Sequence, residues 1–379
     1  MRVLHLVKTS VGATWALRQM RELVRLGVEV HAALPSGGPL VPRYADAGVV
    51  VHPGQFHLPV RQPWRWPALR RQLRELVARV RPDLIHSHFV GTTLALRLAL
   101  GRDHPLPRVF QVPGPLHLEH PVFRRAELRT AGPADRWVGA CRWTCQRYRA
   151  SGIPGDRVFL SYYGADLEAF GARRSGKLRR ELGLDAGTKL VGMVAYLYAP
   201  KRFLGQARGL KGHEDFIDAL ALIREREPDV FGVCIGGAWD GAAAYEARVR
   251  AYAAKRLGGG LRFLGTRGDV PELYPDLDVA VHPSHSENVG GAVESLLMGV
   301  PTIATDVGGF PDLVIPGETG RLVPPRDPAR LASAILETLG DPAGSRAMAD
   351  RGRVRARQLF DARAGAAEIL DIYREVLHP

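Results

Sequence analysis

The sequence predicts an α/β fold, in which parallel strands alternate with helices, and three observations support this class. The N-terminal part reads as strand, helix and strand, with strands at Arg2–Val7 and Val28–Leu34 and a helix capped by Thr14. A strand, a glycine loop, a helix and another strand recur between Asp278 and Ala304. With 379 residues, the chain is long enough for two domains that each have their own core.

The composition predicts a globular protein of the cytoplasm. Hydrophobic residues make up 46% of the chain, and no stretch approaches the roughly 20 apolar residues that a membrane-spanning helix needs. The N-terminus MRVLHLVK reads as a strand and lacks the apolar core of a signal peptide. Three cysteines, Cys141, Cys145 and Cys234, are too few for a disulfide framework, and no histidine stands near the first two at zinc-ligand spacing.

The chain is strongly basic, with a formal net charge of +13 and a pI of about 10.1. Such a charge favours anionic partners, which include nucleotide diphosphates, anionic membranes and nucleic acids. An arginine-rich composition without a functional meaning is an equally good explanation. The sequence predicts no nucleic-acid partner, because no strand interleaves aromatic and basic residues as an RNA-recognition sheet does.

The segment 59–81 is a candidate for contact with an anionic membrane. Its apolar residues, from Leu69 to Val80, form a stripe at helical spacing, and seven arginines cover the remaining faces. Trp64 and Trp66 stand just before this stripe, as in helices that lie on a membrane surface. The alternative is a helix packed on its own sheet with the arginines in water.

The clearest functional signal is the loop that follows the predicted strand Asp278–His282. This loop contains Glu287 and ends in Gly290-Gly291, and Glu294 follows on a helix. Glycine loops backed by a helix N-terminus bring bare backbone N–H groups against an anion. The two glutamates flank the loop and could hold hydroxyl groups of a sugar or a ribose. We therefore expect this region to bind a sugar joined to a diphosphate.

The same region resembles the donor-site signature of the retaining glycosyltransferases of family 4, which have the GT-B fold. That signature runs Pro-Ser, a Glu, seven residues, a second Glu, Gly-x-Pro and Gly-Gly-x-x-Glu. The corresponding residues here are Pro283-Ser284, Glu287, Glu294, Gly299-Val300-Pro301 and Gly308-Gly309-Phe310-Pro311-Asp312. The chain departs from the signature twice, because only six residues separate the two glutamates and an aspartate replaces the last glutamate.

The resemblance implies two Rossmann-like domains whose parallel sheets face a cleft. It places an N-terminal acceptor domain at 1–165, together with a C-terminal helix at about 362–379, and a nucleotide-sugar donor domain at 188–360. The phrase Tyr163-Gly164-Ala165-Asp166 is similar to the family's domain junction, where Asn usually stands in place of the tyrosine.

The resemblance also implies the reaction, which is the metal-independent transfer of a hexose or N-acetylhexosamine with retention of the anomeric configuration. The expected donor is a UDP-sugar, with GDP as the second choice, and no cofactor is expected. The wording of residues 286–314 is similar to bacterial members that glycosylate small natural products such as aminoglycoside precursors, so a small polar acceptor is expected. Alternatives are a lipid-linked or polysaccharide acceptor at a membrane, an epimerase or phosphorylase of the same fold, and a sugar-binding protein without catalysis.

Within the donor domain, the resemblance implies a role for each residue of the signature. Glu287 would act on the sugar hydroxyls, and Glu294 would hold the ribose. The donor would also rest on four loop residues, Asn288, Val289, Gly290 and Gly291.

The expected cations of the donor domain depart from the family pattern. Family members use an Arg and a Lys-Gly pair to bind the diphosphate, but Tyr196 stands in place of the Arg. Lys211 is followed by glycine and is expected to stabilise the leaving diphosphate. A second cation is expected from a basic loop inserted before it, which holds Lys201, Arg202 and Arg208. A surface loop without a role in binding is the alternative for these residues.

In the N-terminal domain, the resemblance implies that His117 contacts the donor sugar, with His120 as the second choice. His86 and His88 occupy the family's His-x-His position and point to the same face of a strand. His88 is the expected acceptor-side residue, and a structural role is the alternative for His86. The first loop keeps one glycine, Gly12, which is expected to approach the donor.

Overall fold

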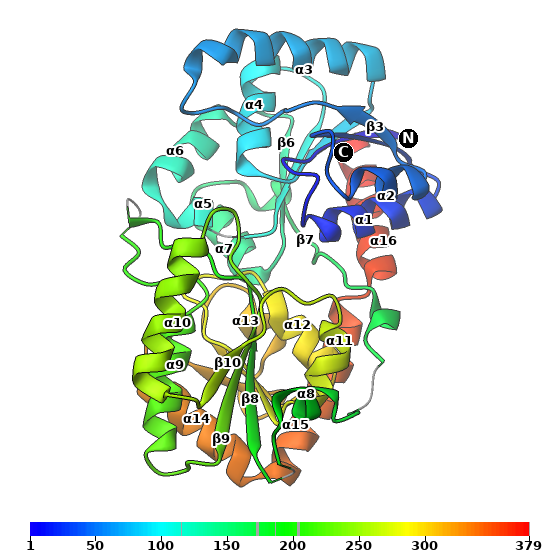
Figure 1. The fold of residues 1–379 in the computed structure, drawn as a ribbon. Helices are drawn as coiled ribbons and strands as arrows, with labels where there is room; N and C mark the ends of the chain where they lie inside the picture. Colours follow the sequence, from blue (N-terminus) through cyan, green and yellow to red (C-terminus); the bar gives the residue numbers. More distant parts are fainter. Residues whose placement is uncertain (115, 172–173, 186, 203–204, 379) are drawn as a thin grey trace. The chain divides into compact units, whose positions relative to one another are not determined.

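The computed structural model describes residues 1–114, 116–171, 174–185, 187–202 and 205–378. The chain forms two compact units, of which unit 1 comprises Met1–Asp166 and Leu359–Pro379, and unit 2 comprises Leu167–Gln358. Each unit holds one parallel sheet with helices on both of its faces (Figure 1). The predicted α/β class with two Rossmann-like domains is confirmed.

The sheet of unit 1 has seven strands in the order β3-β2-β1-β4-β5-β6-β7. Its central strands are buried on both faces, and they carry buried polar residues such as His5, His86 and Gln111 beside the apolar ones. The strands are β1 (Arg2–Leu6), β2 (Glu29–Leu34), β3 (Val50–Pro53), β4 (Leu84–Ser87), β5 (Arg108–Val112), β6 (Asp135–Gly139) and β7 (Val158–Leu160).

The helices of unit 1 cover both faces of this sheet. They are α1 (Thr14–Arg25), α2 (Val41–Asp46), α3 (Trp66–Val80), α4 (Val90–Leu100), α5 (Leu116–Glu119), α6 (Pro121–Thr130), α7 (Arg142–Ala150) and α16 (Ala362–Leu377). The C-terminal helix α16 packs beside α1 on one face, and α3 with α4 covers the other. Thr14 is the first residue of α1 and not its cap, because Ala13 holds the cap position without a side-chain hydrogen bond.

Helix α3 lies within segment 59–81 and uses its apolar stripe inside unit 1. Leu69, Leu73 and Val80 are at most 5% exposed and belong to the core under the sheet. The alternative of a helix packed on its own sheet is therefore confirmed, and Trp64 remains exposed at 71%. No helix among the described residues is long and apolar enough to cross a bilayer.

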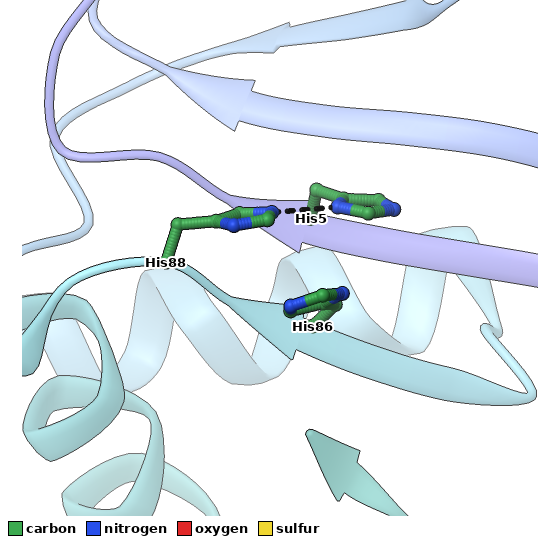
Figure 2. A group of neighbouring side chains, drawn as sticks. All are labelled: His5, His86 and His88. Carbon is green, nitrogen blue, oxygen red and sulfur yellow. Dashed lines mark hydrogen bonds between the residues drawn. The ribbon is translucent and has the colours of Figure 1, made fainter. Parts of the chain in front are cut away.

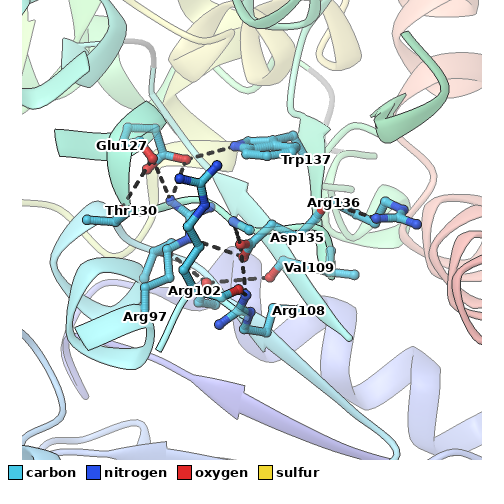
Figure 3. A network of polar contacts seen from close by, with 12 residues as sticks. Arg97, Arg102, Arg108, Val109, Glu127, Thr130, Asp135, Arg136 and Trp137 are labelled. Atoms are coloured by element: carbon cyan, nitrogen blue, oxygen red, sulfur yellow. Dashed lines mark hydrogen bonds and ion pairs between the residues drawn. The ribbon is translucent and has the colours of Figure 1, made fainter. Parts of the chain in front are cut away.

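A buried ionic network ties helix α6 to the sheet of unit 1 (Figure 3). Arg97 of α4 reaches Glu127 of α6 at 3.1 Å and Asp135 of β6 at 3.1 Å. Arg108 of β5 reaches the other oxygen of Asp135 at 3.0 Å, and Trp137 donates its indole N–H to Glu127 at 2.7 Å. Since these charged side chains are at most 2% exposed, each depends on its partners for compensation.

The sheet of unit 2 has six strands in the order β10-β9-β8-β11-β12-β13. The chain runs outward from β8 to β10 and then returns to place β11 on the other side of β8. The strand order therefore reverses between β8 and β11, and ligands of open α/β sheets bind at such a switch point. The strands are β8 (Lys189–Val194), β9 (Val230–Ile235), β10 (Leu261–Phe263), β11 (Val279–His282), β12 (Thr302–Thr305) and β13 (Arg321–Val323).

The helices of unit 2 form two layers around this sheet. They are α8 (Lys177–Leu182), α9 (His213–Arg224), α10 (Ala243–Leu257), α11 (Val270–Leu273), α12 (Gly290–Leu297), α13 (Phe310–Leu313), α14 (Pro328–Gly340) and α15 (Pro342–Leu359). Helices α9, α10 and α14 share one apolar core with the sheet, while α8 and α11 share the core on the other face.

Candidate active site

A cavity of about 300 Å³ lies in unit 2 at the carboxyl ends of β8, β9 and β11, at the switch point of the sheet. The loops after these strands and the first turns of α12 form its walls. The residues that line it with side chains able to bind or stack are Tyr196, Tyr198, Lys211, Thr266, Arg267, His282, Ser284, Glu287, Glu294 and Phe310.

The central pair of this cavity is Lys211 and Glu287. The ammonium of Lys211 donates to Oε2 of Glu287, and the two side chains are 19% and 12% exposed. The other carboxylate oxygen, Oε1, accepts the backbone N–H of Asn288 at 3.0 Å. The ring centroid of Tyr198 lies 5.9 Å from the Lys211 ammonium. The carboxylate therefore holds a cation in position inside a partly dehydrated pocket.

The loop of Lys211 is fixed by close packing against the loop after β11. Gly212 adopts a positive φ of 76°, and a β-carbon there would lie 1.9 Å from the carbonyl oxygen of Pro283. The backbone N–H of His285 donates to the carbonyl of Leu210 at 2.8 Å. Only glycine fits after Lys211, which explains the Lys-Gly pair physically.

The N-terminus of α12 provides the backbone groups that the glycine loop predicted. Gly290 and Gly291 are its first two residues, and first-turn N–H groups lack partners within a helix. A β-carbon on Gly291 would lie 3.1 Å from the carbonyl oxygen of Val194, so the helix approaches β8 closely. Asn288 and Val289 directly precede this turn and are each only 6% exposed.

The second glycine pair, Gly308-Gly309, braces the loop of Glu287 and does not line the cavity. Gly308 has φ +55°, and a β-carbon on it would lie 1.7 Å from the carbonyl oxygen of Glu287. The N–H of Gly309 donates to the carbonyl of Asn288 at 2.7 Å. In this structure the two glycines therefore pack against the loop of Glu287.

A neutral histidine forms part of the floor of the cavity. Burial lowers the pKa of His282 to about 3, and the nearby Lys211 charge acts in the same direction. Its Nε2 lies 3.0 Å from the hydroxyl of Ser295, which in turn accepts from Thr302 at 2.9 Å. His282 therefore adds a fixed dipole to the pocket and no charge.

Two expected cations lie elsewhere, and the structure provides another. Arg208 pairs with Asp215 at 2.5 Å and with Asp218 at 2.8 Å, because it lies beside the first turns of α9. Lys201 is exposed, and neither residue lines the cavity. Part of their loop, 203–204, falls outside the described residues. Among the residues that line the described cavity, the cations are Lys211 and Arg267.

Arg267 was not predicted, although its position after β10 at the carboxyl edge of the sheet was a usable signal. Its guanidinium pairs with Asp269 at 2.8 Å and with Glu181 at 2.5 Å. These hydrogen bonds raise its pKa. Tyr196, which stands in place of the family arginine, packs on Trp239 with ring centroids 4.9 Å apart. This edge of the cavity is thus aromatic where the family pattern expects a cation.

In unit 1, His117 is enclosed by its own domain. Its Nδ1 lies 3.3 Å from the carbonyl of Gly114, so that Nδ1 donates and Nε2 accepts from the hydroxyl of Tyr148 at 2.9 Å. Burial lowers its pKa, and the side chain is neutral. The ring of His120 packs against that of Phe123 at an angle of 53°, with ring centroids 5.2 Å apart.

His88 belongs to a buried cluster with His5 and His86 (Figure 2). All three are 0% exposed, so His88 lies in the core and not on an acceptor surface as expected. The Tyr163 hydroxyl donates to the Gln111 carbonyl at 3.1 Å and accepts from Nδ1 of His88 at 2.8 Å. Nε2 of His88 therefore accepts from Nδ1 of His5, at 2.8 Å. As predicted, His86 and His88 point to one face, where their rings stack 4.2 Å apart.

The geometry of this cluster does not suit a metal ion. One nitrogen of each ring lies within 4.8 Å of the others. The lone pairs of imidazole lie in the ring plane, however, and the rings stack with interplanar angles of 30° or less, so the lone pairs do not converge. Burial lowers the pKa of His5 to about 3. The cluster is a neutral hydrogen-bonded part of the core. The expected first-loop residue, Gly12, is exposed and has φ +76°.

Comparison with known proteins assigns both units. Residues 12–169 match the family model described as Glycosyltransferase Family 4, and residues 202–341 match the model described as Glycosyl transferases group 1. The solved structure of the Anabaena protein HepE in complex with UDP-glucose has a TM-score of 0.83, at 23% identity and with 99% of this chain and 100% of that chain covered. This likeness confirms the fold.

Curated relatives include proteins named D-inositol 3-phosphate glycosyltransferase. The one from Corynebacterium glutamicum is 32% identical over 231 residues, which cover 59% of this chain and 52% of the relative. The one from Acidothermus cellulolyticus is 31% identical over 316 residues, which cover 78% of this chain and 67% of the relative. The chain therefore spans between half and two thirds of the length of these relatives.

Proposed function

Because this chain belongs to glycosyltransferase family 4, we propose that it transfers a hexose or N-acetylhexosamine from a UDP-sugar to a hydroxyl of a small polar acceptor. The expected enzyme class is confirmed by that membership. The observation that carries the proposal is the cavity of unit 2, where Lys211, Glu287 and the first turn of α12 meet at the switch point of the sheet.

We propose that the diphosphate of the donor lies on the backbone N–H groups of Gly290 and Gly291. The ammonium of Lys211 would neutralise the charge that develops on the leaving phosphate, which is the contribution that preorganised cations make best. Glu294, one turn along α12, would hold the ribose, and Glu287 would bind the sugar hydroxyls. In this arrangement Glu287 also keeps Lys211 in place before the donor arrives.

Arg267 is the best candidate for the second cation. Each of Arg267 and Arg208 pairs with two carboxylates, but Arg267 lines the cavity and Arg208 does not. Guanidinium groups recognise phosphate with two parallel hydrogen bonds. We propose that these protein cations are sufficient and that transfer proceeds without a metal, with the acceptor attacking the same face that the diphosphate leaves. Turnover should then persist in EDTA.

Two lines of support converge on the acceptor. The wording of residues 286–314 led us to expect an acceptor such as an aminoglycoside precursor, and the relatives are named for D-inositol 3-phosphate. Both acceptors are polyhydroxylated six-membered carbocycles. We therefore propose a cyclitol or a cyclitol-like small molecule. The HepE complex supports uridine as the base of the donor.

The test is a transfer assay with UDP-glucose and UDP-N-acetylglucosamine against inositol phosphates and aminocyclitols. The expected result is release of UDP that requires an acceptor, with a product of the same anomeric configuration as the donor by proton NMR. Release of UDP without any acceptor would indicate an epimerase or hydrolase. Binding of the donor without turnover on any acceptor would favour a sugar-binding protein.

A further inference from the structure

Unit 2 contains a second and larger cavity, of about 690 Å³, at the opposite edge of its sheet. Lys189, the first residue of β8, lines it, as do Asp278 and Pro301, which precede β11 and β12. Helix α15 and the segment around α8 form its sides. The candidate active site lies at the carboxyl ends of the same strands, so the two cavities are separated by the length of the sheet.

This second cavity is strongly basic. Its lining includes two acidic side chains, Asp278 and Asp350. It also includes five basic side chains, which are Arg174, Arg179, Lys189, Arg346 and Arg353.

Acidic groups compensate these charges only in part. Lys189 pairs with Glu227, which lies outside the lining, at 3.0 Å. Asp278 is shared by two guanidinium groups, those of Arg174 at 2.8 Å and Arg179 at 2.5 Å. The Nε of Arg179 is buried and has no hydrogen-bond partner among the described residues. Arg353 pairs with Asp350, which is itself exposed, at 3.2 Å.

The walls of the cavity are fixed before any ligand binds. Asp276 accepts the backbone N–H groups of Gly176 and Leu178, each at 2.8 Å, and thereby anchors the start of α8. Asp278 accepts the N–H of Leu190 at 2.8 Å while it pairs with the arginines. Apolar side chains, including Met298, complete the lining. The volume lies within the roughly 300–1,000 Å³ that small-molecule sites occupy.

We propose that this cavity binds a small phosphorylated molecule at a site distinct from the donor pocket. A phosphate group matches the planar fork of arginine, and the unbalanced positive charge favours a dianion. The apolar part of the lining would hold the organic body of the ligand. Arg346 and Arg353, which both belong to α15, are the residues that would donate hydrogen bonds to the phosphate.

The probe is inorganic phosphate, titrated by calorimetry at constant ionic strength into four proteins. These are the wild type, the double variant Arg346→Ala/Arg353→Ala, the control Arg357→Ala and the donor-pocket variant Lys211→Ala. Arg357 is an exposed arginine of the same helix that does not line the cavity. The expected result is saturable binding that weakens at least tenfold in the double variant, because two charge-assisted contacts are lost. This binding stays unchanged in Arg357→Ala and persists in Lys211→Ala, which alters only the donor pocket.

Three outcomes would overturn the proposal. These are the absence of saturable binding, equal weakening in Arg357→Ala, and weakening in Lys211→Ala alone, which would place the phosphate in the donor pocket. An unchanged thermal midpoint of the double variant serves as the folding control. The result does not depend on transferase activity. The second site can therefore be absent in an active transferase, and it can be present in a protein without that activity.

Discussion

The two units differ in the solvent exposure of their titratable side chains. In unit 1, His5, His86 and His88 are sealed in the core, where His5 bonds to His88 and His86 bonds to the Tyr373 hydroxyl. The pair of Arg97 and Glu127 is also closed off from water. In unit 2, the equivalent edge of the sheet opens into a cavity where the charged pair of Lys211 and Glu287 remains accessible.

This difference separates residues that hold a domain together from residues that are available to a ligand. A buried charge network contributes to stability only while all its members are present. In an accessible ion pair such as that of Lys211 and Glu287, each side chain can leave its partner and bind a substrate instead. We therefore expect polar substitutions in unit 1 to change stability, and those in the cavity of unit 2 to change turnover.

The largest expected effect is on stability and comes from Glu127→Ala in unit 1. Removing this carboxylate leaves the Arg97 guanidinium without one of its buried partners, which should lower the free energy of unfolding by about 3–5 kcal/mol. Urea denaturation followed by circular dichroism measures it. The matched control is Glu75→Ala, whose exposed pair with Arg71 at 3.9 Å should contribute at most about 1 kcal/mol. Equal effects of the two variants would contradict the structural role of the network.

The next effect is on turnover and comes from Lys211→Ala in unit 2. We expect kcat to fall at least about a hundredfold, which corresponds to about 2.7 kcal/mol, because the leaving diphosphate loses its main cation. Lys201→Ala is the control and should keep kcat near that of the wild type. Arg208→Ala should affect stability more than turnover, since its two aspartates are its partners. Near-normal turnover of Lys211→Ala would remove this residue from the mechanism.

Acid should destabilise both units through their neutral buried histidines. Burial lowers the pKa of His5 in unit 1 and of His282 in unit 2 to about 3. Below pH 6.5 or so the unfolded chain binds a proton at each position and the folded chain does not, so stability falls as pH falls. The expected slope is about 1.4 kcal/mol per pH unit for each such histidine. Unfolding free energies that stay constant from pH 7 to pH 5 would show that these imidazoles are not sealed.

The smallest expected effect concerns contact with membranes. The apolar stripe of α3 is used in the core, so a lipid surface could contact the arginines of the segment and its exposed apolar residues Val60 and Trp64. We expect weak co-sedimentation with anionic vesicles that disappears at high salt and is the same for Trp64→Ala. Binding that resists salt and requires Trp64 would show that this segment inserts into the membrane.

Sequence patterns predicted the α/β class and the four cavity residues Lys211, Glu287, Gly291 and Glu294, because short strands, glycine loops and motif spacing are local features. The patterns failed where the partner of a side chain is set by tertiary packing. Arg208 meets two aspartates of α9 that its own loop does not reveal. His88 lies on the expected face of its strand, but α1, whose Trp15 ring lies 5.7 Å away, and Tyr163 cover that face.

Thermal unfolding in the presence of UDP, GDP and ADP tests most directly whether unit 2 holds the donor. At a hundred times its dissociation constant, a nucleotide that binds only the folded state adds about 2.7 kcal/mol of stability. The account predicts an upward shift with UDP that is lost in Lys211→Ala and kept in Lys201→Ala. The absence of a shift with any nucleotide, or the same shift in Lys211→Ala as in the wild type, would contradict it.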